Sequence, residues 1–437
     1  LRLAAKTMSF HPQSDAQAQP AKAAPPVKLS RYAERLCQFV SETLPPEMVP
    51  ELNFGAPRLD ELPLERWQQL MARAGRLLRE DALTYTSDPF GYLPLREAIA
   101  NYLRRARAAN CTAEQIVIFA EPEAGTDLIC RLFLEPGDTV AVEHPGFPGA
   151  RRMLETQGIA MNPIQVDGQG LIVQQLYNCE TPLKMAYVTP SHHDPTGVVL
   201  SLPRRFELLR WARANGAVII EDDYDSEYRY GEEQAQSLQG LDTDGLVFYR
   251  YNFWRVLYPL VKIGFLVIPR RFISVFQRAK QLLGRDMSLL EQHALADLLT
   301  DGHFERHIRR MRGTYARRRA ALIQSLTIQF GRQVSISSVS AGMHVLVRFQ
   351  TTDNDALIAR CAHEAGFPLT STSVNYTRDP VRGEFLIGFA HLTEDDLREA
   401  TARFAAALAQ ARAETAAKSV QPLHWQLPQT TGIDVSR

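Results

Sequence analysis

The pattern of apolar and polar positions predicts a chain in which strands and helices alternate. Apolar residues recur with helical spacing at residues 30–44, 62–79, 93–109 and 204–215. Short apolar runs predict buried strands at residues 116–120, 139–143, 185–189, 217–222 and 246–251. Strands that alternate with helices favour a parallel sheet with helices on both faces, so the expected fold class is α/β.

The rhythm of the pattern changes along the chain and predicts more than one domain. Residues 270–330 have a helical pattern rich in Arg, and residues 335–412 return to strand–helix alternation with a different spacing. Residues 9–29 are rich in Gln, Ala, Pro and Ser, a composition typical of disorder. We expect a disordered N-terminal arm (1–29), an N-terminal segment packing on the small domain (30–75), a large domain (76–300), a small C-terminal domain (301–415) and a mobile tail (416–437).

Composition places the chain among ordinary globular proteins. Of its 437 residues, 45% are apolar and 22% charged, and the net charge is zero, which argues against a nucleic-acid partner. No apolar run approaches the roughly 18–20 residues that a membrane span needs, and residues 1–7 contain no signal-peptide core. Five cysteines show no metal or redox spacing, as expected of reduced cysteines in a cytoplasmic protein without membrane contact.

Several longer motifs resemble one protein family. They are RRFELLRWARANGAVIIEDDYDSEYRY at 204–230, TPSHHDPTG at 189–197, YTSDPFGYLPLREAIANYL at 85–103 and EHPGFPGARRMLETQG at 143–158. Together they resemble the aminotransferase-like domain of MocR/GabR-type proteins, which are fold-type I proteins that bind pyridoxal phosphate (PLP). The resemblance runs from about residue 29 to residue 410. The family usually carries a winged-helix domain, which we expect to be missing here because fewer than thirty residues precede the core.

The resemblance implies a fold, an assembly and a site. The fold would be that of the fold-type I PLP-transferases: a large domain with a mostly parallel seven-stranded sheet, plus a smaller α+β C-terminal domain. The assembly would be a homodimer that binds a small amino-acid-like ligand where the carboxyl ends of the strands converge. By their place in the motifs, Asp222 matches the carboxylate that contacts the pyridine nitrogen, Tyr224 matches the partner of the phenolic oxygen, and Phe147 matches the residue that stacks on the ring.

The segment that resembles the family's lysine motif departs from it. The family reads roughly GTFSK, then P, then R-x-G, whereas this chain has Tyr-Asn-Phe-Trp-Arg at 251–255. Arg255 therefore stands where the family has the Schiff-base lysine, Trp254 where it has a phosphate-binding hydroxyl, and Lys262 where it has the phosphate arginine. A guanidinium stays protonated and cannot act as the amine nucleophile.

The opposite wall of the expected phosphate site departs as well. The family has a Gly-Ala-Gln type turn that opens a helix, and this chain has Glu121-Pro122-Glu123 there. Proline removes an amide donor, and two carboxylates repel a phosphate. From both walls we expect that PLP is an unlikely ligand as a Schiff base.

His192, His193 and Asp194 are the residues that suggest a replacement for PLP. Two histidines and a carboxylate suit iron or another divalent metal, and a haem with His193 as axial ligand is an alternative. The plainer interpretation is a hydrogen-bonded His–Asp pair.

The sequence thus favours an enzyme repurposed for PLP-independent, metal-dependent (iron) chemistry on an amino acid or related metabolite in a biosynthetic pathway. Three alternatives stay open: a non-catalytic metabolite-binding or partner pseudoenzyme, a haem-dependent enzyme, and residual PLP or pyridoxamine phosphate (PMP) activity without the lysine. The catalytic candidates are Arg255, His193, Asp194, Asp222 and Tyr224. The cofactor-binding candidates are Glu121, Glu123, Phe147, Asp222, Tyr224, Trp254 and Lys262.

Overall fold

The computed structural model describes residues 28–40, 57–77, 88–230, 236–283, 287–337, 341–351 and 353–419. Most of the predicted arm at 1–29, and residues 420–437 of the predicted tail, lie outside these residues. Residues 416–419, also assigned to the tail, continue the last helix. Among the described helices, none combines the length and the hydropathy that crossing a bilayer requires.

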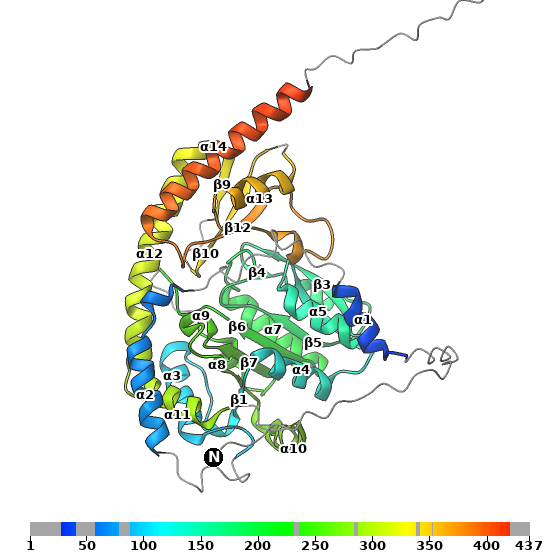
Figure 1. Cartoon of the computed structure of the whole chain (residues 1–437). Coiled ribbons are helices and arrows are strands. Elements are labelled where there is room, and N and C mark those ends of the chain that lie inside the picture. The colour runs from blue at the N-terminus through cyan, green and yellow to red at the C-terminus, as the bar shows by residue number, and fades with distance from the viewer. Residues whose placement is uncertain are drawn as a thin grey trace, which may run out of the picture.

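A large sheet forms the centre of the molecule (Figure 1), and in the described residues it has eight strands in the order β1-β8-β7-β6-β5-β2-β3-β4. Strands β7, β6, β5, β2 and β3 are parallel, whereas β8 is antiparallel to both β1 and β7. The bounds are β1 (Ile116–Phe119), β2 (Thr139–His144), β3 (Ala160–Asp167), β4 (Gly170–Leu171), β5 (Leu183–Val188), β6 (Val218–Asp223), β7 (Val247–Asn252) and β8 (Gly264–Val267). The mostly parallel sheet is confirmed. The expected seven strands become eight because the two-residue β4 folds back on the end of β3.

Helices cover both faces of this sheet, which explains the continuous apolar runs of its strands. Within β6, Ile220 packs in one apolar cluster with Leu128 and Leu154, and its neighbour Ile219 packs in another with Leu208 and Trp211. Successive strand residues point to opposite faces, so one strand supplies both clusters. The helices of this part are α3 (Leu93–Arg107), α4 (Pro122–Phe133), α5 (Pro148–Gln157), α6 (Gln174–Tyr177), α7 (Leu202–Asn215), α8 (Leu238–Leu241), α9 (Trp254–Leu257), α10 (Ile273–Leu283) and α11 (Leu289–Thr300).

A second, smaller sheet lies at one end of the molecule and is antiparallel throughout. Its order is β11-β12-β10-β9, with β9 (Val334–Ile336), β10 (His344–Phe349), β11 (Leu369–Ser371) and β12 (Glu384–Gly388). Helices α13 (Asp355–Glu364) and α14 (Glu394–Ser419) accompany it. The 28-residue helix α12 (His303–Phe330) runs along one side of the molecule, from α11 to β9 of the smaller sheet (Figure 1).

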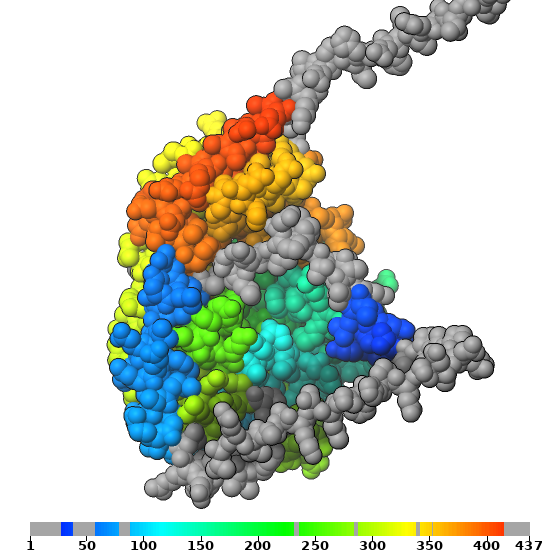
Figure 2. All heavy atoms as spheres, viewed as in Figure 1, coloured from blue at the N-terminus to red at the C-terminus, as the bar shows by residue number. Residues whose placement is uncertain are grey.

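The N-terminal elements pack on different parts of the molecule. Helix α1 (Arg31–Val40) lies against α5, and α2 (Leu64–Leu77) lies against α11. Figure 2 shows α2 and the preceding short 3-10 helix η1 (Leu59–Glu61) on the surface, close to the start of α14.

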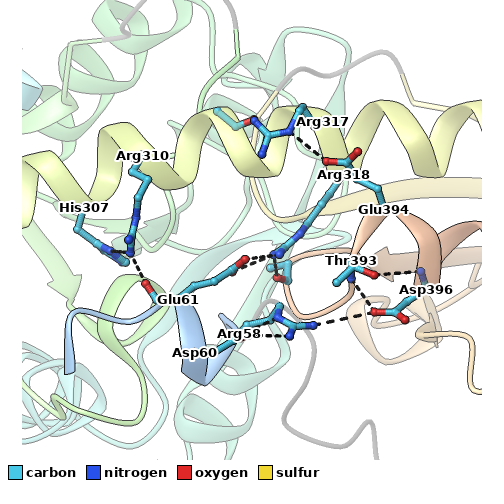
Figure 3. A network of polar contacts seen from close by, with 12 residues as sticks. Arg58, Asp60, Glu61, His307, Arg310, Arg317, Arg318, Thr393, Glu394 and Asp396 are labelled. Atoms are coloured by element: carbon cyan, nitrogen blue, oxygen red, sulfur yellow. Dashed lines mark hydrogen bonds and ion pairs between the residues drawn. The ribbon is translucent and has the colours of Figure 1, made fainter. Parts of the chain in front are cut away.

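An ion-pair network fixes η1 between α12 and α14 (Figure 3). Both carboxylate oxygens of Glu61 accept from the guanidinium of Arg318, whose side chain is only 5% exposed. Arg318 also donates to the Ala390 carbonyl, and Arg58 lies 4.0 Å from Asp396 at the start of α14. The network therefore joins three segments that are far apart in sequence.

Candidate functional site

Polar side chains gather where the parallel strands β5, β6 and β7 end. Asp222 lies at the end of β6, and it shares the α4-facing side of the sheet with Ile220, two residues earlier. Its register partner on β7 is Arg250. Both side chains are buried, with 4% and 2% of their residues exposed.

Asp222 is incompletely satisfied in this position. Its Oδ2 accepts a 2.5 Å hydrogen bond from the Tyr187 hydroxyl. Its Oδ1 lies 3.2 Å from Arg250 Nε, yet neither atom has a hydrogen-bond partner. Burial raises the pKa of Asp222, and Arg250 is the largest opposing influence. The site thus contains a buried carboxylate oxygen with an unused hydrogen-bonding position.

Arg250 crosses from β7 to α4 and was not among the residues expected from the sequence. Its guanidinium donates to Glu123 Oε1 at 2.8 Å and to the Tyr187 hydroxyl at 2.8 Å. A charged residue inside an apolar strand run was the available signal, because a buried arginine requires partners. Tyr187 gave no such signal, since a tyrosine in a strand is ordinary.

Glu121, Pro122 and Glu123, which depart from the family's motif, lie at the start of α4. Glu121 is the N-cap of the helix and Pro122 its first residue. Lys262 Nζ lies 3.9 Å from Glu121 Oε1, and the side chains of Glu121, Glu123 and Lys262 are 48%, 54% and 64% exposed. Burial, together with Glu123, raises the pKa of Glu121. Both glutamates are therefore paired with cations but reach solvent.

Arg255 lies over the ring of Tyr224, the residue that directly follows β6. The Arg255 guanidinium carbon is 5.5 Å from the centroid of the Tyr224 ring and 5.0 Å from that of Trp254. The Tyr224 hydroxyl is 3.1 Å from His192 Nδ1. Arg255 also lowers the pKa of Asp194, which burial nevertheless raises to about 6. A permanent cation thus lies over the Tyr224 ring and acts on the Asp194 carboxylate through its charge.

His192 is held by Asp225 and by the second sheet. Its Nδ1 lies 2.7 Å from Asp225 Oδ1, and its ring centroid is 5.1 Å from that of His344 at the start of β10. Gly342 has a φ of +75°, and an added Cβ there would come within 2.2 Å of His192 Cε1. The sequence did not indicate Asp225 or His344, because only the tertiary structure brings β10 to the ends of β5 and β6.

His193 and Asp194 do not converge with His192 on a metal position. His193 Nε2 donates to the Pro145 carbonyl at 3.0 Å, so its Nδ1 accepts the Thr196 hydroxyl at 2.7 Å. Asp194 Oδ1 accepts from the Asn375 amide, and burial lowers the pKa of His193 to about 3. Within the described ranges, no three His, Cys, Asp or Glu side chains are grouped as metal ligands. His193 therefore has no free nitrogen for iron or haem.

The other two expected residues lie at the edges of the site. Phe147 is the N-cap of α5, directly after the loop that follows β2, and its ring is half-buried. Trp254 begins α9, where its amide donates to Asn252 Oδ1 at 3.1 Å.

Comparison with known proteins identifies the family. Residues 48–404 match the family model described as aminotransferase class I and II. The chain is 34% identical over 366 residues to the uncharacterised HTH-type transcriptional regulator YhdI of Bacillus subtilis, covering 83% of this chain and 76% of YhdI. It is 31% identical over 378 residues to the probable rhizopine catabolism regulatory protein MocR of Rhizobium meliloti, covering 86% of this chain and 76% of MocR.

A solved structure shows the same fold. It is that of the α-aminoadipate aminotransferase LysN of Thermus thermophilus, complexed with N-(5'-phosphopyridoxyl)-L-leucine. The match has a TM-score of 0.76 at 24% identity and covers 88% of this chain and 98% of LysN.

These matches overturn two expectations from the sequence. PLP-independent chemistry with iron or haem was wrong, and so was the expectation that PLP is an unlikely cofactor, because the relatives point to PLP-dependent, aminotransferase-like function. The positions that depart from the family's motifs are few, whereas the family match extends over residues 48–404. From the match over residues 48–404, the chain belongs to the family of class I and II aminotransferases.

Proposed function

We propose that this chain binds PLP or PMP at the ends of β5, β6 and β7 without a covalent bond, and that it serves an aminotransferase-like function on an amino-acid substrate. The observation that carries the proposal is Asp222 Oδ1, which is buried and lacks a hydrogen-bond partner. A buried acceptor without a donor costs about 1–3 kcal/mol. A protonated pyridine nitrogen would supply the missing donor, and its charge would add to that of Arg250, which lies 3.2 Å from the same oxygen.

The chain's own residues fit the ring of the cofactor. Asp222 would hold the pyridine nitrogen in its protonated form, in which the bound cofactor acts as an electron sink. Tyr187 already donates to Oδ2 of the same carboxylate, so Oδ1 is the oxygen left to accept. Tyr224 directly follows β6, and Phe147 lies after the loop that follows β2. The resemblance implies that Tyr224 contacts the phenolic oxygen and that Phe147 stacks on the ring.

Arg255 is the reason to propose non-covalent binding. By sequence motif it stands in place of the family's lysine, its guanidinium lies over the Tyr224 ring, and its charge lowers the pKa of Asp194. A guanidinium remains protonated and can only donate hydrogen bonds or pair with anions. Arg255 would therefore orient an anionic oxygen of the cofactor or substrate and would not bond to its carbon.

The phosphate end requires a rearrangement. Lys262 and the first amides of α4 are the groups that favour an anion, and Glu121 lies 3.9 Å from the Lys262 ammonium. Because Glu121 and Glu123 are about half exposed, their carboxylates can turn toward water when a phosphate pairs with Lys262. Affinity should consequently be lower than in a site that opens with glycine.

A spectroscopic titration tests this proposal. Adding PLP or PMP to the purified chain should shift the cofactor's absorption band and raise the melting temperature. Asp222→Asn should raise the Kd about tenfold or more, since it removes a charge-assisted hydrogen bond of about 1.5–3 kcal/mol. Asp127→Asn, on a later turn of α4, is the matched control and should leave Kd unchanged.

Reduction with borohydride tests the non-covalent part separately. Mass spectrometry should find no cofactor adduct on the wild-type chain, and Arg255→Lys should gain one. An adduct on wild-type Lys262 would refute the role given to Arg255 while leaving cofactor binding intact. Failure of both PLP and PMP to bind would refute the proposal as a whole.

A second candidate function is ligand sensing without turnover. It is favoured by the regulators YhdI and MocR, each matched over 76% of its length, and by the guanidinium at 255, which cannot act as a base at neutral pH. Incubating the chain with PMP and a panel of 2-oxo acids separates the two candidates. Amino-acid formation supports an enzyme, and stabilisation by the same ligands without product supports a sensor.

A further inference from the structure

A second pocket lies apart from this site, on the other side of the segment that follows β6. It opens between the end of α3, residues 226–227 and the start of α12, and its volume is about 270 Å³. In β6, Asp222 faces α4, whereas its neighbour Asp223 pairs with Arg107 of α3 at 2.7 Å. The pocket adjoins Arg107, so the β6 strand end separates it from the proposed cofactor site.

The inner wall of the pocket carries polar atoms without partners. Glu227 is 4% exposed, and its Oε1 accepts from the hydroxyls of Tyr251 at 2.6 Å and Tyr102 at 3.0 Å. Its Oε2 has no hydrogen-bond partner, and neither has the Oγ of Ser226, which is 7% exposed. Buried polar atoms are nearly always paired, so the two atoms without partners that line this cavity are hydrogen-bonding positions that a bound molecule can fill.

The mouth of the pocket is cationic. Arg105 pairs with Glu305 across the opening, and Arg312 donates to the Glu227 backbone carbonyl at 2.8 and 3.1 Å. Arg309 also lines the pocket, and within the part of the chain that the structure describes it makes neither a hydrogen bond nor an ion pair. Three arginines therefore face one glutamate at the entrance.

We propose that this pocket binds a small zwitterionic metabolite, with its carboxylate or phosphate on Arg309 and its ammonium on Glu227 and Ser226. The charge order of the pocket matches such a molecule: a buried carboxylate at the inner end and guanidinium groups at the mouth. The volume corresponds to about nine water molecules at ~30 Å³ each, enough for a short amino acid. This inference does not rest on the proposed cofactor function.

Isothermal titration of the full chain at pH 8 tests the pocket, with O-phospho-L-serine and β-alanine as probes. Burial raises the pKa of Glu227 to about 7, so its carboxylate is ionised under this condition. At least one probe should bind, and acetate and ethylamine, which each carry one of the two charges, should bind at least tenfold more weakly.

Variants locate the binding. Arg309→Gln and Glu227→Gln should each raise the Kd of the bound probe about tenfold or more, which is the loss of one charge-assisted contact. Arg104→Gln is the matched control, because Arg104 is an exposed arginine of α3 outside the pocket lining. Gln at 227 still offers an oxygen to both tyrosines; if that variant fails to fold, Ser226→Ala takes its place.

Two results would overturn the pocket as a ligand site. One is the absence of binding by either probe to the wild-type chain. The other is binding that survives Arg309→Gln and Glu227→Gln but is lost in Asp222→Asn, because the probe would then occupy the proposed cofactor site.

Discussion

Replacing Arg250 by leucine should destabilise the chain by an amount that depends on pH. Arg250 is the main group that favours the ionised form of buried Asp222, 3.2 Å away. Removing one partner of a buried ion pair costs about 3–5 kcal/mol, because the other charge is left uncompensated. The loss of the ion pair with the second carboxylate partner, Glu123, should cost little stability, because this side chain is 54% exposed and its carboxylate can turn toward water.

The sign of the pH dependence follows from the direction of the pKa shift. Burial raises the pKa of Asp222 above its ordinary value, and loss of Arg250 raises that pKa further. The folded state then holds a proton that the unfolded state has released, so stability falls as pH rises from the unfolded pKa through the folded one. Arg250→Leu should consequently lose more stability at pH 8 than at pH 5.

Thermal melting at both pH values measures this effect. With an unfolding entropy of about 2.1 cal/mol/K per residue, a chain of this size loses roughly 1 °C per kcal/mol, so the melting temperature should fall by about 3–5 °C at pH 8. Arg213→Leu, at an arginine whose side chain is 72% exposed, should change it by less than about 0.5 °C, and Asp222→Asn combined with Arg250→Leu should recover most of the loss. An equal loss at pH 5 and pH 8, or no recovery in the double variant, would refute the role of the pair.

Three further predictions concern other parts of the structure. Gly342→Ala should lower the free energy of unfolding by about 2–5 kcal/mol and weaken PLP binding, because alanine would be strained at positive φ and would overlap His192. Gly313→Ala in α12, which has open space around it, should be neutral or slightly stabilising. Equal melting temperatures for the two variants would contradict the contact with His192. Arg318→Ala should lower the free energy of unfolding by about 3 kcal/mol or more, because it leaves Glu61 without its buried partner. Arg398→Ala, which removes an exposed ion pair, should lower it by less than about 1 kcal/mol, and urea unfolding measures both values. Burial lowers the pKa values of His193 and His344 to about 3. The unfolded chain therefore takes up protons first, and the free energy of unfolding should fall as pH decreases from about 6.5 toward 4. If His344→Asn leaves the slope of unfolding free energy against pH unchanged in that range, His344 does not contribute to the effect.

The sequence by itself determined the framework of the large sheet. Alternation of apolar runs with helical spacing located β1, β2, β5, β6 and β7, because strands buried on both faces must be apolar throughout. The motif at 221–224 also placed Asp222 and Tyr224 at a strand end, and the motif resemblance located the opening of α4 at Glu121-Pro122. The predicted domain limits and the homodimer stay predictions.

Only the tertiary structure decided which polar groups are satisfied. His193 resembled a metal ligand in sequence, yet both of its nitrogens are used by Pro145 and Thr196. Strand register, which the sequence pattern did not reveal, sets Arg250 beside Asp222, and β10 brings His344 to His192 from more than a hundred residues away. Hydrogen-bond partners and desolvation depend on distances of a few ångströms between segments, and periodicity along one segment does not encode them.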